Sequence, residues 1–185
     1  MKAGETVIGL ERGKVALLDH EKAWEKEAEN TILKLRSVLG DTIKDISHVG
    51  STSVPSIKAK PIIDIAVAVE SFDEILKYEN ELRKAGFYYR PQNGDGLENQ
   101  LLFACGSFYD GTGSLQTHFI HVVICRSKEW TDYINFRDYL KSNPAVAKEY
   151  EALKIASAEK YENDRNKYVE SKHAFIASVL EKSYS

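Results

Sequence analysis

The chain of 185 residues contains 25 lysines and arginines and 28 aspartates and glutamates, giving a formal net charge of −3, and 43% of its residues are hydrophobic. This composition excludes a disordered chain, and the near-neutral charge excludes bulk electrostatic capture of nucleic acid. No apolar run is long enough for a membrane span, and the two cysteines form no Cys-x-x-Cys motif. We expect a cytoplasmic protein with no membrane partner, and a single domain over residues 1–185 with residues 1–18 as a flexible lead-in.

The first half of the chain is predicted to supply two helices and three strands. Apolar residues three or four apart indicate the first helix, and the nearly continuous β-branched run at 61–69 is typical of a strand buried on both faces. In chain order the predicted elements are a helix over 20–39 ended by Gly40, a strand over 42–49, the strand over 61–69, a helix over 71–85 capped by Ser71, and a strand over 87–90.

The second half is predicted to supply a loop, two strands and three helices. Two glycines with Asn and Asp make residues 91–98 a turn or mobile loop, and Asn143-Pro144 is a strong helix start. The elements are strands over 100–108 and 114–125 around a turn at 109–113, then helices over 127–141, 144–162 and 165–181. The expected fold class is α+β: a mixed β-sheet of about five strands flanked by helices, with a helical C-terminal third.

The first candidate site is Gly50-Ser51-Thr52, which follows His48 at the end of a predicted strand. Glycine lets the backbone approach a ligand, and backbone N–H groups together with hydroxyls can surround a phosphate. A Ser/Thr turn that only joins two strands is the alternative interpretation.

Asp64 is the only charged residue between Ile62 and Val69. A carboxylate inside a buried strand costs several kcal/mol unless it is paired, hydrogen-bonded or bound to a metal. Two interpretations stay open: an acceptor of backbone N–H bonds from the preceding loop, or a metal-facing carboxylate at the floor of a pocket.

Basic residues also fall on apolar helix stripes. Arg137 lies inside one stripe, and Lys172 lies near the centre of the stripe of the last helix, with Arg165 on the same side. Such cations either extend along the surface to reach water or meet a buried anion, which is Asp64 or a ligand phosphate. In the predicted strand over 114–125, alternation directs His118 and His121 to opposite faces. The combination with Asp64 favours His121 as the site residue.

Five motifs follow one another along the chain: H-V-G-S-T-S-V-P-S-I-K-A-K-P-I-I-D-I, F-I-H-V-V, W-x-x-Y-x-x-F-R-D-Y-L, N-P-x-x-A-x-E-Y-x-x-L-K and D-R-x-x-Y-x-x-x-K-x-x-F-I. This ordered series resembles the GrpB family, a group with the nucleotidyltransferase fold. The resemblance implies a mixed sheet like the catalytic core of nucleotidyltransferases. In that superfamily a Gly-Ser pair binds nucleotide phosphates, and carboxylates on the next strands hold two divalent ions.

The predicted site combines the resemblance with the candidates above. Asp64 matches the first metal carboxylate and, with His121, forms the catalytic set. The phosphate- or nucleotide-binding set consists of His48, Gly50, Ser51, Thr52, Lys60, Arg137 and Lys172.

The chain departs from the family pattern at several positions. Ala66 stands where the superfamily has its second carboxylate, and no acid accompanies His121 on the later strand. Ser56 replaces a frequent glycine, and residues 94–100 lack an expected arginine. One acid cannot assemble a two-metal site, so we expect at most one weakly held Mg²⁺ or Mn²⁺, completed by a ligand phosphate.

Two classes of function therefore remain open. The first is an enzyme that transfers a nucleotidyl group with the help of a metal. The second is a non-catalytic module that binds a nucleotide or phosphorylated small molecule, or another protein. Phosphate binding by a loop and cations needs no second carboxylate, so the missing acid favours binding over transfer.

Overall fold

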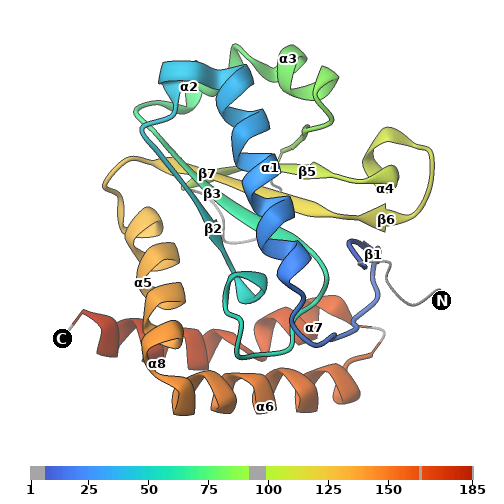
Figure 1. Cartoon of the computed structure of the whole chain (residues 1–185), viewed down its shortest axis with the longest axis vertical. Helices are drawn as coiled ribbons and strands as arrows, with labels where there is room; N and C mark the ends of the chain where they lie inside the picture. Colours follow the sequence, from blue (N-terminus) through green and yellow to red (C-terminus); the bar gives the residue numbers. More distant parts are fainter. Residues whose placement is uncertain (1–6, 92–98, 163, 185) are drawn as a thin grey trace.

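A mixed five-stranded sheet forms the centre of the molecule (Figure 1). The computed structural model describes residues 7–91, 99–162 and 164–184. The strand order is β2-β3-β7-β5-β4, in which β3 and β7 are parallel and all other neighbours are antiparallel. The strands are β2 (Asp45–Val49), β3 (Ile63–Val69), β4 (Tyr88–Arg90), β5 (Gln100–Cys105) and β7 (His118–Ile124). The predicted α+β fold class is confirmed.

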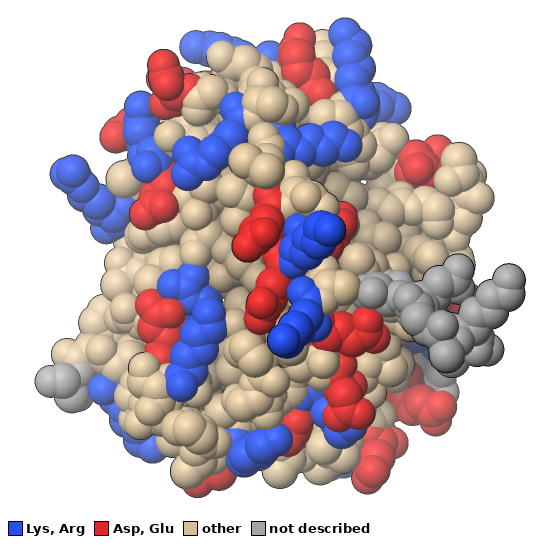
Figure 2. Space-filling model, viewed as in Figure 1, with Lys and Arg blue, Asp and Glu red and all other residues tan. Residues whose placement is uncertain are grey.

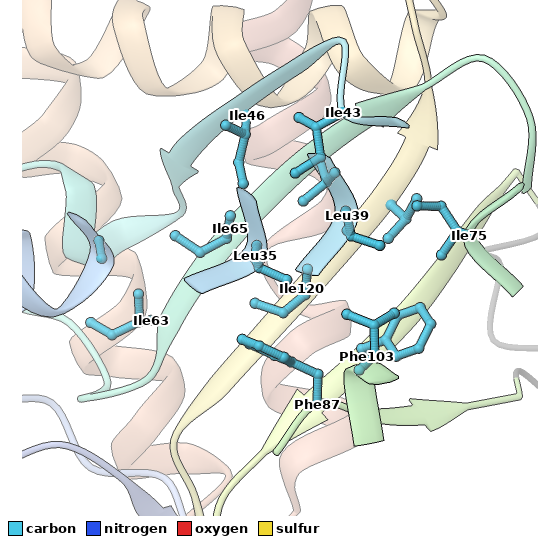
Figure 3. Packing of buried hydrophobic residues seen from close by; sticks show 14 of the residues in the cluster. Leu35, Leu39, Ile43, Ile46, Ile63, Ile65, Ile75, Phe87, Phe103 and Ile120 are labelled. Atoms are coloured by element: carbon cyan, nitrogen blue, oxygen red, sulfur yellow. The ribbon is translucent and has the colours of Figure 1, made fainter. Parts of the chain in front are cut away.

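Helix α1 (Lys22–Leu39) covers one face of the sheet and closes the main hydrophobic core (Figure 1). In this core Leu35 of the helix lies beside Ile65 and Ile120 of the central strands (Figure 3). Because successive side chains of a strand point to opposite faces, Asp64 lies on the other face of the sheet.

Four C-terminal helices follow, of which α5 (Lys128–Ser142) packs on β2, β3 and β7, and α6 (Pro144–Lys160), α7 (Arg165–Glu170) and α8 (His173–Ser183) lie beside one end of the sheet (Figure 1). They pack on the segment after β2 through a second apolar cluster that consists of Val54, Ile57, Leu140, Ala147 and Tyr150. The predicted helical C-terminal third is confirmed.

The predicted helix over 71–85 is two helices, α2 (Phe72–Leu76) and α3 (Glu79–Lys84). Ile75, Tyr78 and Leu82 all contact the main core, and they keep helical spacing across the break. The periodicity therefore could not reveal that the helix ends and restarts.

The two predicted strands of the second half are shorter than expected. The first stops at Cys105, because Gly106 adopts φ +120° and a short helix α4 (Ser107–Asp110) follows. The second is divided, and β6 (Leu115–Gln116) leaves the main sheet to pair with β1 (Leu10–Glu11). The predicted loop at 91–98 lies outside the described residues except for its first position.

The predicted helix over 165–181 is also interrupted, between α7 and α8. Beside the interruption, the Ser171 hydroxyl donates to the Tyr168 carbonyl at 2.8 Å and contacts the Ser157 hydroxyl of α6 at 2.9 Å, which links this segment to α6. Lys172 lies within this break and is the N-cap of α8.

Residues 1–18 were expected to form a flexible lead-in, and residues 1–6 of it lie outside the described residues. The described remainder makes specific backbone pairs with the rest of the fold. Gly9 N–H donates to the Pro61 carbonyl at 2.6 Å, and Leu18 and Ala59 exchange two hydrogen bonds of 2.8 and 2.9 Å. Backbone pairing of this kind leaves no periodic signal in the side chains, so the sequence did not indicate it.

The surface is chemically mixed. On the face shown in Figure 2, acidic and basic side chains are interspersed rather than separated into patches. Among the described residues, no helix is both long enough and apolar enough to cross a membrane.

Candidate functional site

A pocket of about 600 Å³ lies between the sheet face opposite α1 and the C-terminal helices. Its floor comes from the Gly-Ser-Thr loop (residues 50–52), from Asp64 on β3 and from His121 on β7. Helices α5 to α8 contribute its walls, which include the rings of Tyr133, Phe136, Tyr150 and Tyr168. This volume is typical of sites for small molecules.

The Gly-Ser-Thr loop passes directly over Asp64. Val49 pairs with Asp64 across β2 and β3, so the next residue, Gly50, meets the carboxylate. A Cβ added at Gly50 would lie 2.6 Å from Asp64 Oδ2, and the backbone there has φ +71°. Only glycine satisfies both the left-handed backbone and the close approach. The structure thus brings together the two strongest candidates of the sequence.

A hydrogen-bonded chain leads from Asp64 into the pocket wall. Asp64 Oδ1 lies 3.1 Å from His121 Nε2, and His121 Nδ1 lies 3.0 Å from the Tyr133 hydroxyl. That hydroxyl donates to Gln100 Oε1 at 3.0 Å. Burial, and then the charge of Asp64, hold the pKa of Tyr133 well above its usual range, so the phenol keeps its proton. Both ring nitrogens of His121 therefore have partners, and His121 orients Asp64.

The donor set does not fit two metal ions. Ala66 lies opposite His121 in the parallel β3–β7 pair, so a methyl group occupies the position of a second carboxylate. Within residues 7–91, 99–162 and 164–184, no group of three or more His, Cys, Asp or Glu side chains could hold a metal ion. Asp64 could contribute to one ion, with the remaining ligands from water and from a bound phosphate.

Four basic side chains line the same pocket: Lys60, Lys154, Arg165 and Lys172, hereafter the four pocket cations. In the described part of the chain, none of them has an ion-pair partner within 4.0 Å. Aromatic rings hold them instead. Lys60 and Lys172 lie 5.2 and 4.4 Å from the centre of the Tyr168 ring. Arg165 lies 5.3 Å from the ring centre of Phe119.

Burial and mutual repulsion act on these cations. Burial, followed by the charges of Lys172 and Arg165, lowers the pKa of Lys60 to about 7. Burial and the charge of Lys172 lower the pKa of Lys154 to about 7. Burial lowers the pKa of Lys172 itself to about 8, although Asp64 opposes the shift. The lowered pKa values therefore reflect burial and mutual repulsion among the cations, which Asp64 offsets only in part.

His48 does not line the pocket, although the sequence placed it in the phosphate-binding set. Its Nε2 lies 2.9 Å from the Thr52 hydroxyl, so it supports the Gly-Ser-Thr loop from behind. Burial lowers the pKa of His48 to about 4, which leaves it neutral at pH 7. The alternation of β2 puts His48 on the same side as the core residue Ile46, which is why it cannot face the ligand.

Arg137 is also absent from the pocket, contrary to the sequence prediction. Its Nη1 donates to the Ser47 hydroxyl and to the His48 carbonyl, and its Nε donates to Asp138 at 2.7 Å. Arg137 thus fastens α5 to the edge strand β2. The sequence offered Asp64 or a ligand phosphate as the partner of this cation, whereas its partners in the structure are Ser47, the His48 carbonyl and Asp138.

Sequence reasoning missed Lys154, which is only 1% exposed. Its Nζ donates to the Lys58 carbonyl and lies 4.9 Å from the ring centre of Tyr150. The signal existed, since Lys154 falls on the buried stripe of α6 together with Ala147, Tyr150 and Ser157. Tyr133 and Gln100 were missed as well, because nothing in their local sequence distinguishes them from core residues.

Comparison with known proteins places the chain among close relatives. The family model described as GrpB protein matches residues 14–182. The chain is 40% identical over 176 residues to the glutamate-rich protein GrpB of Alkalihalophilus pseudofirmus, which covers 94% of this chain and 98% of that one. Identity to the dephospho-CoA kinase of Mycobacterium tuberculosis is 23% and covers 95% of this chain but 47% of the kinase.

Two solved structures have a fold similar to that of this chain. A crystal structure of conserved protein GrpB from Enterococcus faecalis superposes with a TM-score of 0.80 at 29% identity, covering 91% of this chain and 96% of that one. The Cid1 poly(U) polymerase with MgGTP bound matches with a TM-score of 0.51 at 15% identity, over 77% of this chain and 44% of the polymerase. The predicted nucleotidyltransferase-like architecture is confirmed at the level of the fold.

Proposed function

This chain belongs to the GrpB family, and from the geometry of its pocket we propose that it binds a nucleotide or another phosphorylated small molecule. The observation that carries the proposal is the convergence of the four pocket cations beside the Gly-Ser-Thr loop. Cations without an ion-pair partner are costly where they are withdrawn from water, as Lys154 is fully and the other three are partly, so their presence in one cavity favours an anionic ligand there.

The loop supports the same assignment. Gly50 allows a close backbone approach, and Ser51 and Thr52 bring hydroxyl groups to the pocket. Ser51 acts on the pKa of the Tyr150 phenol of α6, which lines the same pocket, and the Thr52 hydroxyl lies 2.9 Å from His48 Nε2. The loop is therefore fixed from two sides before any ligand arrives, as a preorganised phosphate site requires.

The remainder of the ligand would lie against the aromatic walls. Tyr133, Phe136 and Tyr150 supply ring surfaces on the side of α5 and α6, and Ile176 of α8 adds apolar surface. A pocket that combines cations with aromatic and apolar surface suits a phosphorylated compound with a planar or apolar group, such as a nucleoside.

Metal-dependent nucleotidyl transfer is the second candidate. The position of Asp64 against the loop favours it, and the fold resembles that of a poly(U) polymerase. A fold hosts many functions, however, and the donor set does not fit two ions. If one divalent ion binds, Asp64 would hold it, and the ion would supply charge stabilisation to the ligand phosphates.

A thermal-shift screen tests the proposal. The panel contains nucleoside mono-, di- and triphosphates, inorganic phosphate, coenzyme A and dephospho-coenzyme A, the last two included because one relative is a dephospho-CoA kinase. At least one phosphorylated compound should raise Tm, its unphosphorylated counterpart should not, and Lys172→Met should abolish the shift. Lys26→Met, an exposed lysine of α1, is the matched control and should keep it. A panel without any stabilising compound would contradict the proposal.

A further inference from the structure

We propose that the pocket recognises the di- or triphosphate group of its ligand in metal-free form, with lysine and arginine side chains in the positions that divalent ions would otherwise serve. This inference rests on the proposed function and specifies the ligand class. The juxtaposition that carries it is four basic side chains and one loop-facing carboxylate around a single cavity.

The charge balance points to a polyanion. Asp132 is paired with Lys128, and Glu129 accepts a hydrogen bond from Asn99, whereas the charge of Asp64 acts on Lys60 and Lys172 and offsets about one of the four positive charges. A monophosphate supplies about two further negative charges at neutral pH, which would still leave one of the four pocket cations without a counter charge. A di- or triphosphate supplies enough charge for the whole set.

The lysines respond to charge in a way that fits this ligand. In the empty pocket, burial and the neighbouring cations lower the pKa of Lys60 and Lys154 to about 7, so part of the positive charge is lost as protons. A polyanion would favour the protonated amines and restore that charge. The pocket would therefore gain positive charge as its ligand binds.

The positions of the cations suit adjacent phosphates. Lys60, from the segment before β3, and Lys172, from the break between α7 and α8, approach the ring of one residue, Tyr168. Arg165 is held at Phe119 and also donates from Nη1 to Gln116 Oε1 at 2.6 Å. Cations fixed by rings and hydrogen bonds on separate elements can contact neighbouring phosphates of one chain without reorganisation.

The side chains of the pocket are poorly suited to hold a divalent ion. Asp64 alone offers too few oxygens for an octahedral shell, and Ala66 removes the second carboxylate. A magnesium ion already bound to a polyphosphate cancels about two of the charges that the cations would meet. Magnesium should therefore compete with the pocket for the ligand rather than assist it.

Titration calorimetry separates the possibilities. ATP, ADP, AMP and pyrophosphate are titrated into the full chain, once with EDTA and once with magnesium in excess. We expect ATP and pyrophosphate to bind with EDTA at least ~3-fold more tightly than with magnesium, and AMP to bind at least ~10-fold more weakly than ATP. Tighter binding with magnesium, or equal affinity for AMP and ATP, would overturn the inference but leave the proposed function standing. No binding of any compound in either buffer would contradict both.

Asp64→Asn gives the sharpest contrast. It replaces a negative charge beside the loop by a neutral group of the same shape, so pyrophosphate with EDTA should bind at least as tightly as to the parent. If Asp64 instead held a metal ion, Asp64→Asn would weaken pyrophosphate binding in the magnesium buffer. That loss of affinity would overturn the inference. Lys60→Met should weaken pyrophosphate binding ~10-fold with EDTA, and Lys26→Met should leave it unchanged. Circular dichroism verifies that each variant is folded.

Discussion

The two faces of the central sheet differ sharply although the same strands build both. Toward α1, residues such as Ile63, Ile65 and Ile120 form a closed apolar core (Figure 3). Toward the C-terminal helices, the alternate positions carry Asp64 and His121, and the helices add unpaired cations. The apolar face contributes to stability, whereas the face toward the C-terminal helices carries charged groups whose burial is unfavourable.

This difference indicates that the functional site lies on the face toward the C-terminal helices. The α1 face shows that these strands can pack against apolar side chains, yet the opposite face of the same strands is lined by polar and charged residues. Proteins keep such unfavourable arrangements mainly at binding and catalytic sites. Substitutions on the two faces should therefore have different consequences, and the following variants test that expectation from the largest effect to the smallest.

The largest effect is expected from the core face. Ile65→Ala should lower the free energy of unfolding by about 2–5 kcal/mol, because Ile65 is fully buried among large side chains. On the pocket face, Lys172→Met removes a buried charge while it keeps most of the side-chain volume, and stability should not fall. Urea unfolding of both variants makes the comparison. Equal losses would show that the two faces do not differ as described.

The next effect concerns the contact between the loop and Asp64. Gly50→Ala should lose about 2 kcal/mol more stability than Gly86→Ala, together with phosphate binding. Both glycines have positive φ, +71° and +87°, but only at Gly50 would a new Cβ meet Asp64, whereas nothing lies within 4 Å at Gly86. The two variants share the backbone strain, and only Gly50→Ala adds a clash with Asp64. Equal losses of stability would show that the contact between Gly50 and Asp64 is not tight.

Arg137 should matter for stability and not for binding. Arg137→Met removes the hydrogen bonds to Ser47 and to the His48 carbonyl, at a cost of about 1–2 kcal/mol. Affinity for pyrophosphate should stay within about twofold of the parent, since Arg137 lies outside the pocket. A large loss of affinity in a folded variant would return Arg137 to the binding set.

The smallest effect is a pH dependence of stability. Lys60 has a pKa of about 7 in the folded protein and 10.5 as its ordinary value, so below pH 7 it is charged in both states and its burial is fully unfavourable. As pH rises from 7 toward 10.5, Lys60 loses its proton in the folded state but keeps it in the unfolded state, so the free-energy cost of burying its charge declines. Lys60→Met should therefore raise Tm by at least ~2 °C near pH 6 and progressively less toward pH 10. A gain independent of pH would contradict this account.

Much of the fold was predictable because side-chain periodicity reports burial. The strand over 61–69 and the stripe of α1 appear in the sequence almost as they occur in the structure. The breaks at Tyr78 and Lys172 were not predictable, since helical spacing of apolar residues continues through both: Ile75, Tyr78 and Leu82 span the first, and Tyr168 and Phe175 span the second. Short strands such as β1 depend on backbone pairing, which leaves no side-chain pattern.

The site was partly predictable for a related reason. Asp64 stood out because a lone charge in an apolar strand is rare, and the structure places it against the Gly-Ser-Thr loop. A cation on an apolar stripe does not reveal its acceptor, so the sequence did not indicate that Arg137 binds Ser47 and the His48 carbonyl, or that Lys154 lines the pocket. The partner of such a side chain depends on how the helices are arranged, which periodicity alone does not contain.

The most direct test of the central claim is an NMR titration of the full chain with pyrophosphate in EDTA. The account predicts saturable shifts of the backbone amides of Ser51 and Thr52 and of the side-chain signals of Lys60 and Lys172, with the amides of Ala28 and Leu35 on the α1 face unchanged. Shifts that spread over surface lysines without saturation, or that leave the Gly-Ser-Thr loop unaffected, would contradict it.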